Sequence, residues 1–172
     1  LITFLDSFKA KQIIDYPSLF DGELEMDITA NPFDPSDSPS EITDRMTELM
    51  LSYEYEVIKT EVAKDGLSAI VTLEFTTVNL GSIFSTFMMK YIAKAFELAF
   101  SGATEAEMNQ WAVDLFLEAS DGATKDKVTQ VDVKMVLVDK KWLIHVDKED
   151  ISLFDAMMGG FITTMQNLQP EE

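Results

Sequence analysis

The chain has 172 residues and a formal net charge of -18, from 31 acidic and 13 basic side chains. Hydrophobic residues make up 47% of it, which suits the core of a single folded domain and excludes wholesale disorder. Because phosphate contacts need clustered lysine and arginine, this charge argues against nucleic acid or an anionic membrane surface as partners. The absence of cysteine excludes disulfides, thiol catalysis and cysteine metal ligands.

The first 51 residues are predicted to form two helices joined by an extended connection. The first helix lies within 1–14, where Leu1, Phe4, Leu5 and Phe8 recur at helical spacing. The acidic connection, 21–41, contains the proline-rich FDPSDSPSE, and its carboxylates match no EF-hand spacing, so no metal site is predicted. A helix over 41–51 follows, with Ser38 or Ser40 as its cap. Its inward positions are Ile42, Met46, Leu49 and Met50.

Two alternating runs flank Asp65-Gly66, a dipeptide that favours a β-hairpin. A two-residue loop at this point fixes the register of the two strands. It pairs Val62 with Ala69, Thr60 with Val71, Ile58 with Leu73, and Glu56 with Phe75. The carboxylate of Glu56 then lies at the end of an otherwise apolar face, and the opposite face is predicted to be solvated.

A helix pair is predicted over 80–119. Ser101-Gly102 ends its first helix, and Thr104 with Glu107 forms a capping box that begins the second. The methionines and aromatic residues of the pair are interpreted as core side chains, not as a cofactor site. Lysines and a glutamate interrupt the longest apolar segment, so no membrane span is predicted. The inward stripe of the first helix is Leu80, Phe84, Phe87, Met88, Tyr91, Ala95 and Leu98.

The clearest strand pattern in the chain covers 131–146. A turn at Asp139-Lys140 pairs Leu137 with Trp142, Met135 with Ile144, and Val133 with Val146, all on one apolar face. Trp142 is therefore expected to face the core, and His145 to lie on the opposite, partly wet face. Two short helical segments, 151–158 and 161–168, follow on either side of Gly159-Gly160.

This order of elements predicts an α+β fold, with a curved antiparallel sheet of about four strands, in two hairpins, covered by helices. The segments FLDSFKAKQ, VAKDGLSAIVTLEFTTVN and VKMVLVDKKWLIHVDKEDISLFDAMMG resemble the cystatin-like or nuclear-transport-factor-two-like domains of secreted Gram-positive lipoproteins of unknown function. The resemblance implies one cone-like domain over 1–172. It also implies a signal and a lipid-anchoring cysteine upstream of Leu1, and hence an extracellular, membrane-anchored location.

Four side chains are predicted to lie near a pocket, if the sheet and its helices enclose one: Glu56, Phe75, Tyr91 and Trp142. A buried Glu56 would have a raised pKa and could act as an acid or base. His145, the single histidine, lies opposite Lys134 in the predicted register. A catalytic imidazole needs a carboxylate to orient it and a neighbouring lysine works against it, so no catalytic residue is assigned. With one histidine, no cysteine and no glycine-rich phosphate loop, no metal site and no cofactor are predicted.

Three classes of function fit these features. The favoured one is a non-enzymatic extracellular domain that binds an unidentified small ligand or protein partner at the cell envelope. The first alternative is an isomerase- or dehydratase-like enzyme with Glu56 as its pocket carboxylate. The second alternative is an oligomerisation or interaction module that uses the Met- and Phe-rich helices.

Overall fold

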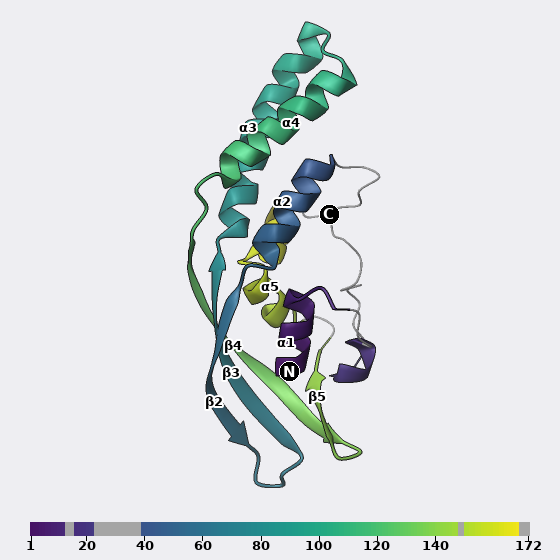
Figure 1. Cartoon of the computed structure of the whole chain (residues 1–172), viewed down its shortest axis with the longest axis vertical. Helices are drawn as coiled ribbons and strands as arrows, with labels where there is room; N and C mark the ends of the chain where they lie inside the picture. The colour runs from purple at the N-terminus through teal and green to yellow at the C-terminus, as the bar shows by residue number, and fades with distance from the viewer. Residues whose placement is uncertain (13–15, 23–38, 148–149, 169–172) are drawn as a thin grey trace.

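The computed structural model of the chain describes residues 1–12, 16–22, 39–147 and 150–168 (Figure 1). A five-stranded sheet in the order β1-β5-β4-β3-β2 forms its lower part, and helices pack on one face of that sheet. The predicted α+β class, a curved sheet covered by helices, is confirmed. The acidic connection predicted over 21–41 lies mostly outside the described residues.

Neighbouring strands of the sheet run antiparallel, except that β1 and β5 are parallel. The strands are β1 (Phe20–Asp21), β2 (Glu54–Val62), β3 (Ser68–Val78), β4 (Lys125–Val138) and β5 (Lys141–His145). The helices are α1 (Ile2–Lys9), α2 (Ser40–Met50), α3 (Leu80–Ser101), α4 (Glu105–Ser120), α5 (Ser152–Met157) and α6 (Phe161–Leu168), and a 3-10 helix, η1 (Tyr16–Leu19), precedes β1. The sequence prediction of about four strands missed β1, because two residues carry no alternating pattern.

The β4–β5 hairpin has the predicted register, with Leu137 opposite Trp142 and Met135 opposite Ile144. Its loop residues, Asp139 and Lys140, have φ values of 48° and 66°. Positive φ at both loop positions is what a type I′ turn requires, and it matches the twist of the two strands. Trp142 shares the covered face of the sheet with the buried Ile144, as predicted, but it does not reach the core. The hairpin extends past the covering helices, and Trp142 remains 42% exposed.

The β2–β3 hairpin departs from the predicted register at one point. Val62 pairs with Ala69 and Thr60 with Val71, as predicted, but a β-bulge follows between Val57 and Lys59. The extra residue of the bulge reverses the parity of the strand beyond it. Tyr55, not Glu56, is therefore the partner of Phe75 on the covered face.

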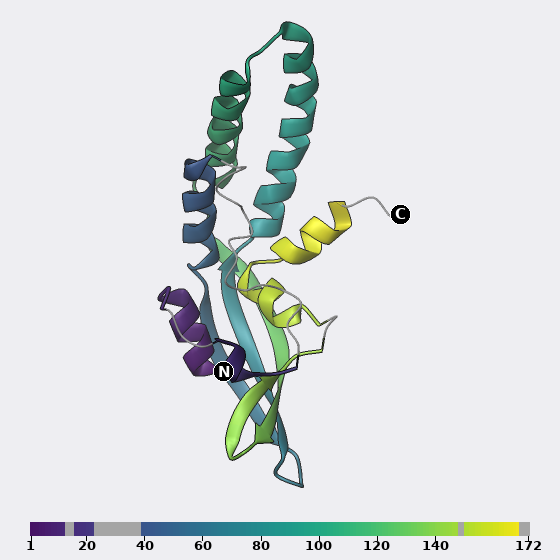
Figure 2. The same ribbon diagram turned by 90° about the vertical axis from the view of Figure 1, so that its right-hand side faces the viewer.

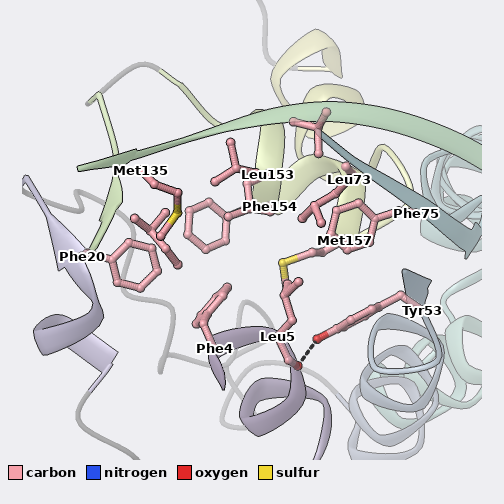
Figure 3. Packing of buried hydrophobic residues seen from close by; sticks show 14 of the residues in the cluster. Phe4, Leu5, Phe20, Tyr53, Leu73, Phe75, Met135, Leu153, Phe154 and Met157 are labelled. Carbon is pink, nitrogen blue, oxygen red and sulfur yellow. Dashed lines mark hydrogen bonds between the residues drawn. The ribbon is translucent and has the colours of Figure 1, made fainter. Parts of the chain in front are cut away.

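The covered face of the sheet is filled by aromatic and aliphatic side chains (Figure 3). The ring of Phe4, on α1, lies at 5.1 Å from that of Phe20 and 6.1 Å from that of Phe154, centre to centre. Tyr53 is fully buried, and its hydroxyl donates a 2.6 Å hydrogen bond to the carbonyl oxygen of Leu5. Since an aromatic pair in edge or offset geometry adds to the energy of burial, this cluster fixes α1 on the sheet.

α3 and α4 form an antiparallel pair that projects beyond the end of the sheet (Figures 1 and 2). The predicted capping box at the start of α4 is present, with Thr104 and Glu107 each accepting a backbone N–H bond. Arg45, on α2, donates to the carbonyl oxygen of Ser120 at 3.0 Å and so holds α2 against the end of α4. The serine cap predicted for α2 is wrong, because Pro39 precedes the helix and Ser40 is its first residue.

The projecting pair is fixed to the sheet at a buried junction of three glycines, Gly81, Gly159 and Gly160. Gly159 has φ 58°, and its carbonyl oxygen accepts bonds from the Gly81 N–H at 3.3 Å and from Lys127 Nζ at 3.0 Å. A side chain on Gly159 would overlap the carbonyl oxygen of Val78, at the end of β3. The backbones of Gly159 and Val78 are therefore in direct contact, which only a residue without a side chain allows.

Tyr55 makes the stability of the fold sensitive to alkaline pH. Burial of its ring, a 2.6 Å hydrogen bond to Asp6 and the charge of that carboxylate raise the pKa of Tyr55 from 10.0 to about 12. A folded-state pKa above the unfolded one contributes stability that is complete below pH 10 and is lost as pH rises through 12. We expect wild type to be more stable than Tyr55→Phe by a constant margin below pH 10, and this margin to shrink above it. Thermal unfolding of both proteins across this range measures the margin, and a constant difference up to pH 12 would contradict the assignment.

Candidate functional site

The four predicted pocket residues lie on different parts of the molecule. Phe75 is fully buried in the core beneath the sheet, where its ring packs against those of Tyr53 and Tyr55. Tyr91 stacks on Trp111 between α3 and α4, with ring centres 5.7 Å apart, whereas Trp142 lies at the open end of the β4–β5 hairpin. As a set of ligand-binding residues they therefore stay a prediction that rests on sequence alone.

Glu56 is exposed on the uncovered face of the sheet, opposite Glu74. The bulge in β2 puts it there, since every residue on the far side of a bulge changes face. The expectation that Glu56 would lie on the apolar face is therefore wrong. The isomerase or dehydratase alternative loses its one named carboxylate for this reason.

Two hollows lie among the described residues and are candidate ligand sites. The larger, about 190 Å³, opens to solvent at the base of α3 and is lined by Val78, Asn79, Ser82, Ile83, Ala119, Gly122, Ala123, Thr124 and Asp126. The smaller, about 20 Å³, lies beside His145 and Ser152. Sites for drug-sized ligands usually measure about 300–1,000 Å³, so neither hollow has the room of such a site. Neither is lined by any of the four predicted pocket residues.

His145 has two carboxylate neighbours, and one of them, Asp21, was not expected from the sequence. Its Nδ1 lies 2.9 Å from Asp21, on β1, and its Nε2 lies 3.4 Å from Asp147. Asp21 can therefore orient the ring of His145, and the sequence prediction did not include it, because β1 pairs with β5 across 124 residues of sequence. The nearby Ser152 hydroxyl donates instead to Asp150, at 2.6 Å. The arrangement therefore ties β1 to β5 and presents no activated nucleophile in the described residues.

Neither a metal site nor a membrane-spanning helix is found in the part of the chain that the structure describes. No group of three or more His, Asp or Glu side chains is arranged to hold a metal ion there. No helix there has both the length and the apolar character needed to cross a membrane.

The most distinctive surface feature is an apolar line on the outer side of α3. Four side chains, Met89, Ile92, Phe96 and Phe100, are 65%, 50%, 67% and 90% exposed. Their spacing of three, four and four residues places them on one face of a helix. We call this set the α3 stripe. An exposed and contiguous apolar patch of this kind is a usual mark of an interaction site.

The inner side of α3 packs against α4 and α6. Phe84 packs edge-on against Phe161 of α6, and Phe87 packs edge-on against Phe116 of α4. Lys90 pairs with Glu118 of α4 at 3.0 Å. The α3 stripe lies on the side of the helix away from these contacts, so nothing in the described residues covers it.

Sequence reasoning identified the inner stripe of α3 and missed the outer one. The signal was present, because from Met88 to Phe100 the helix has only three charged residues, Lys90, Lys94 and Glu97. A surface helix usually has one apolar face, and a helix that is apolar nearly all round is buried on both sides. The second apolar face therefore indicated that α3 needs a partner beyond α4.

Comparison with known proteins leaves the family of the chain open. No protein-family model matches it, and no curated protein matches it. Among solved structures it is similar to YcdA, a putative lipoprotein from Bacillus subtilis, with a TM-score of 0.43 and 19% sequence identity. The similarity covers 77% of this chain but only 41% of that one.

Proposed function

We propose that the chain is a non-enzymatic, extracellular domain of a lipoprotein, held at the cell envelope, and that it binds a protein partner through the α3 stripe. The exposed stripe is the observation that carries this proposal. Aromatic residues and methionine are enriched in protein interfaces, and the stripe consists of two phenylalanines, a methionine and an isoleucine. A chain without cysteine also has no thiol to be oxidised outside the cell.

A protein partner is favoured over a small ligand for two reasons. The covered face of the sheet, where such folds hold ligands, is filled by the core around Phe4, Tyr53 and Phe75. The α3 stripe is instead a convex, exposed line on a helix. Such a surface suits a helix or groove of another protein, because small molecules bind in concave sites.

The test is photo-crosslinking in the cells that make the protein. A photoreactive phenylalanine analogue replaces Phe96, in the middle of the stripe, and the cells are irradiated before the proteins are separated by mass. We expect one discrete crosslinked protein adduct. The matched control places the same analogue at Ile58, which is exposed on β2 away from the helices.

An adduct from position 96 and none from position 58 would support the α3 stripe as the binding surface. The absence of an adduct at position 96, or equal adducts from both positions, would contradict it. Because the side chain of Phe96 is two-thirds exposed, the replacement does not disturb the core, and a normal unfolding temperature verifies this.

A further inference from the structure

The geometry of the α3 stripe suits another helix as its direct neighbour. The four residues advance by three, four and four positions, so they span eleven steps along the chain and follow the helix axis closely. At 1.5 Å per residue the stripe is about 16 Å long. A straight apolar line of this length is the seam along which two helices pack in a bundle.

The charges around the stripe distinguish between possible occupants. α3 contains Lys90, Lys94 and Glu97 as its charged residues, so two positive charges and one negative charge give it a net charge of +1, in a chain of -18. Lys94 pairs with Glu97 at 2.5 Å, and Lys90 pairs with Glu118. The border of the stripe is thus nearly neutral. A basic partner would be attracted to the acidic surface elsewhere, and Glu105 and Glu107 at the tip of the pair would oppose entry into an anionic membrane.

The exposed area of the stripe is adequate for the centre of a dimer interface. With about 200 Å² for each large side chain, the exposed fractions give an apolar area of about 500 Å² on one copy. A standard interface buries about 800 Å² on each partner, much of it in a polar rim. The stripe would therefore form the interface core, and its flanking residues would complete the rim.

We infer that the partner is a second copy of this chain, and that the two α3 helices pack antiparallel, with Met89 of one copy opposite Phe100 of the other. The two α3–α4 pairs then form a layer of four helices, with the two α3 helices at its centre and α4 of each copy on the outside. The antiparallel direction follows from the shape of the molecule. Because α3 and α4 project from the sheet, this direction keeps the two acidic bodies at opposite ends of the layer (Figure 1). This inference rests on the proposed function, since it names the partner of the same surface.

The first test is the mass of the purified chain in solution, by sedimentation or light scattering over a range of concentrations. We expect twice 19.4 kDa for wild type at high concentration. The double substitution Phe96→Gln and Phe100→Gln is expected to weaken dimerisation about a hundredfold or more, because four buried rings are lost from each dimer. The matched control, Ile58→Gln with Val62→Gln, changes two exposed residues of β2 and should leave the dimer intact.

Salt provides a second readout from the same samples. Sodium chloride screens the repulsion between two copies of charge -18, so we expect it to tighten the dimer. Added salt would instead weaken binding to a basic partner, because it screens the attraction between opposite charges. A wild type that stays monomeric at every concentration and salt, or a dimer that both double variants leave unchanged, would overturn the inference.

The antiparallel direction is tested separately by measuring the distance between spin labels attached to Ser101→Cys in the two copies. The labelling is specific because the chain has no other cysteine. In the antiparallel dimer the backbones of residue 101 in the two copies are about 20 Å apart along the axis of the paired α3 helices. In a parallel dimer they are about 10 Å apart, and that distance would refute the arrangement. The crosslinking experiment separates the two proposals: an adduct with a different protein refutes the second copy alone, and no adduct refutes both.

Discussion

Phe4→Ala is expected to destabilise the chain by about 3–5 kcal/mol, the usual cost of removing a fully buried phenylalanine. Phe4 has no exposed surface, and its ring contacts those of Phe8, Phe20 and Phe154. These rings join α1 to β1 and α5 beneath the sheet (Figure 3). The substitution therefore leaves a cavity that three elements line. Urea unfolding followed by circular dichroism measures the effect.

Ile2→Ala is the matched control, since Ile2 lies on the same helix and is 43% exposed. Substitutions at such surface positions usually change stability by less than about 0.5 kcal/mol. The difference in stability between Phe4→Ala and Ile2→Ala thus separates the loss of packing from the change in helix propensity. Equal effects at the two positions would mean that α1 does not dock on the sheet as described.

Gly159→Ala is expected to cost about 3–5 kcal/mol, for two reasons that act together. A left-handed residue other than glycine is strained by about 1–2 kcal/mol. In addition, the new methyl group would overlap the carbonyl oxygen of Val78, which the end of β3 holds in place. Forcing these backbones apart also stretches the hydrogen bonds of Gly159 to Gly81 and Lys127. Thermal and urea unfolding of the variant measure the total cost.

Gly102→Ala separates the two contributions. Gly102 has φ 74°, close to the φ of Gly159, but a methyl group there would meet no atom within 4 Å. Only the conformational strain remains, so we expect a loss of about 1–2 kcal/mol. If the two alanine variants are equally stable, the close approach of backbone at the glycine junction is refuted.

The register of both hairpins could be predicted from the sequence because it depends on local information. Alternation and a turn signal placed Met135 opposite Ile144 and Val62 opposite Ala69, and the structure has both pairs. The bulge in β2 could not be predicted, because an extra residue in a strand leaves no mark in the alternation until the partner strand is known. That single residue moved Glu56 from the apolar face to the exposed one.

Long-range contacts account for most of what sequence reasoning missed. The contact between His145 and Asp21 depends on β1, a two-residue strand that is too short for an alternating sequence pattern to predict. Helical spacing correctly marked the packed side of α3 from Leu80 to Tyr91, whereas the side chain of Leu98 lies outside the described residues. The outer face was not identified, because periodicity shows that a face is apolar but does not show what covers it. Only the packing of α4 and α6 on one side of α3 leaves Phe96 and Phe100 exposed.

The central claim is that a protein covers the α3 stripe in the cell, and oxidation of Met89 tests it most directly. Among the described residues, Met89 is the methionine with a largely exposed side chain. Cells are treated briefly with peroxide, and sulfoxide at Met89 is measured by mass spectrometry in wild type and in the Phe96→Gln, Phe100→Gln variant. We predict slow oxidation in wild type, where the partner covers Met89, and fast oxidation in the variant. Equally fast oxidation of Met89 in both proteins would contradict the account.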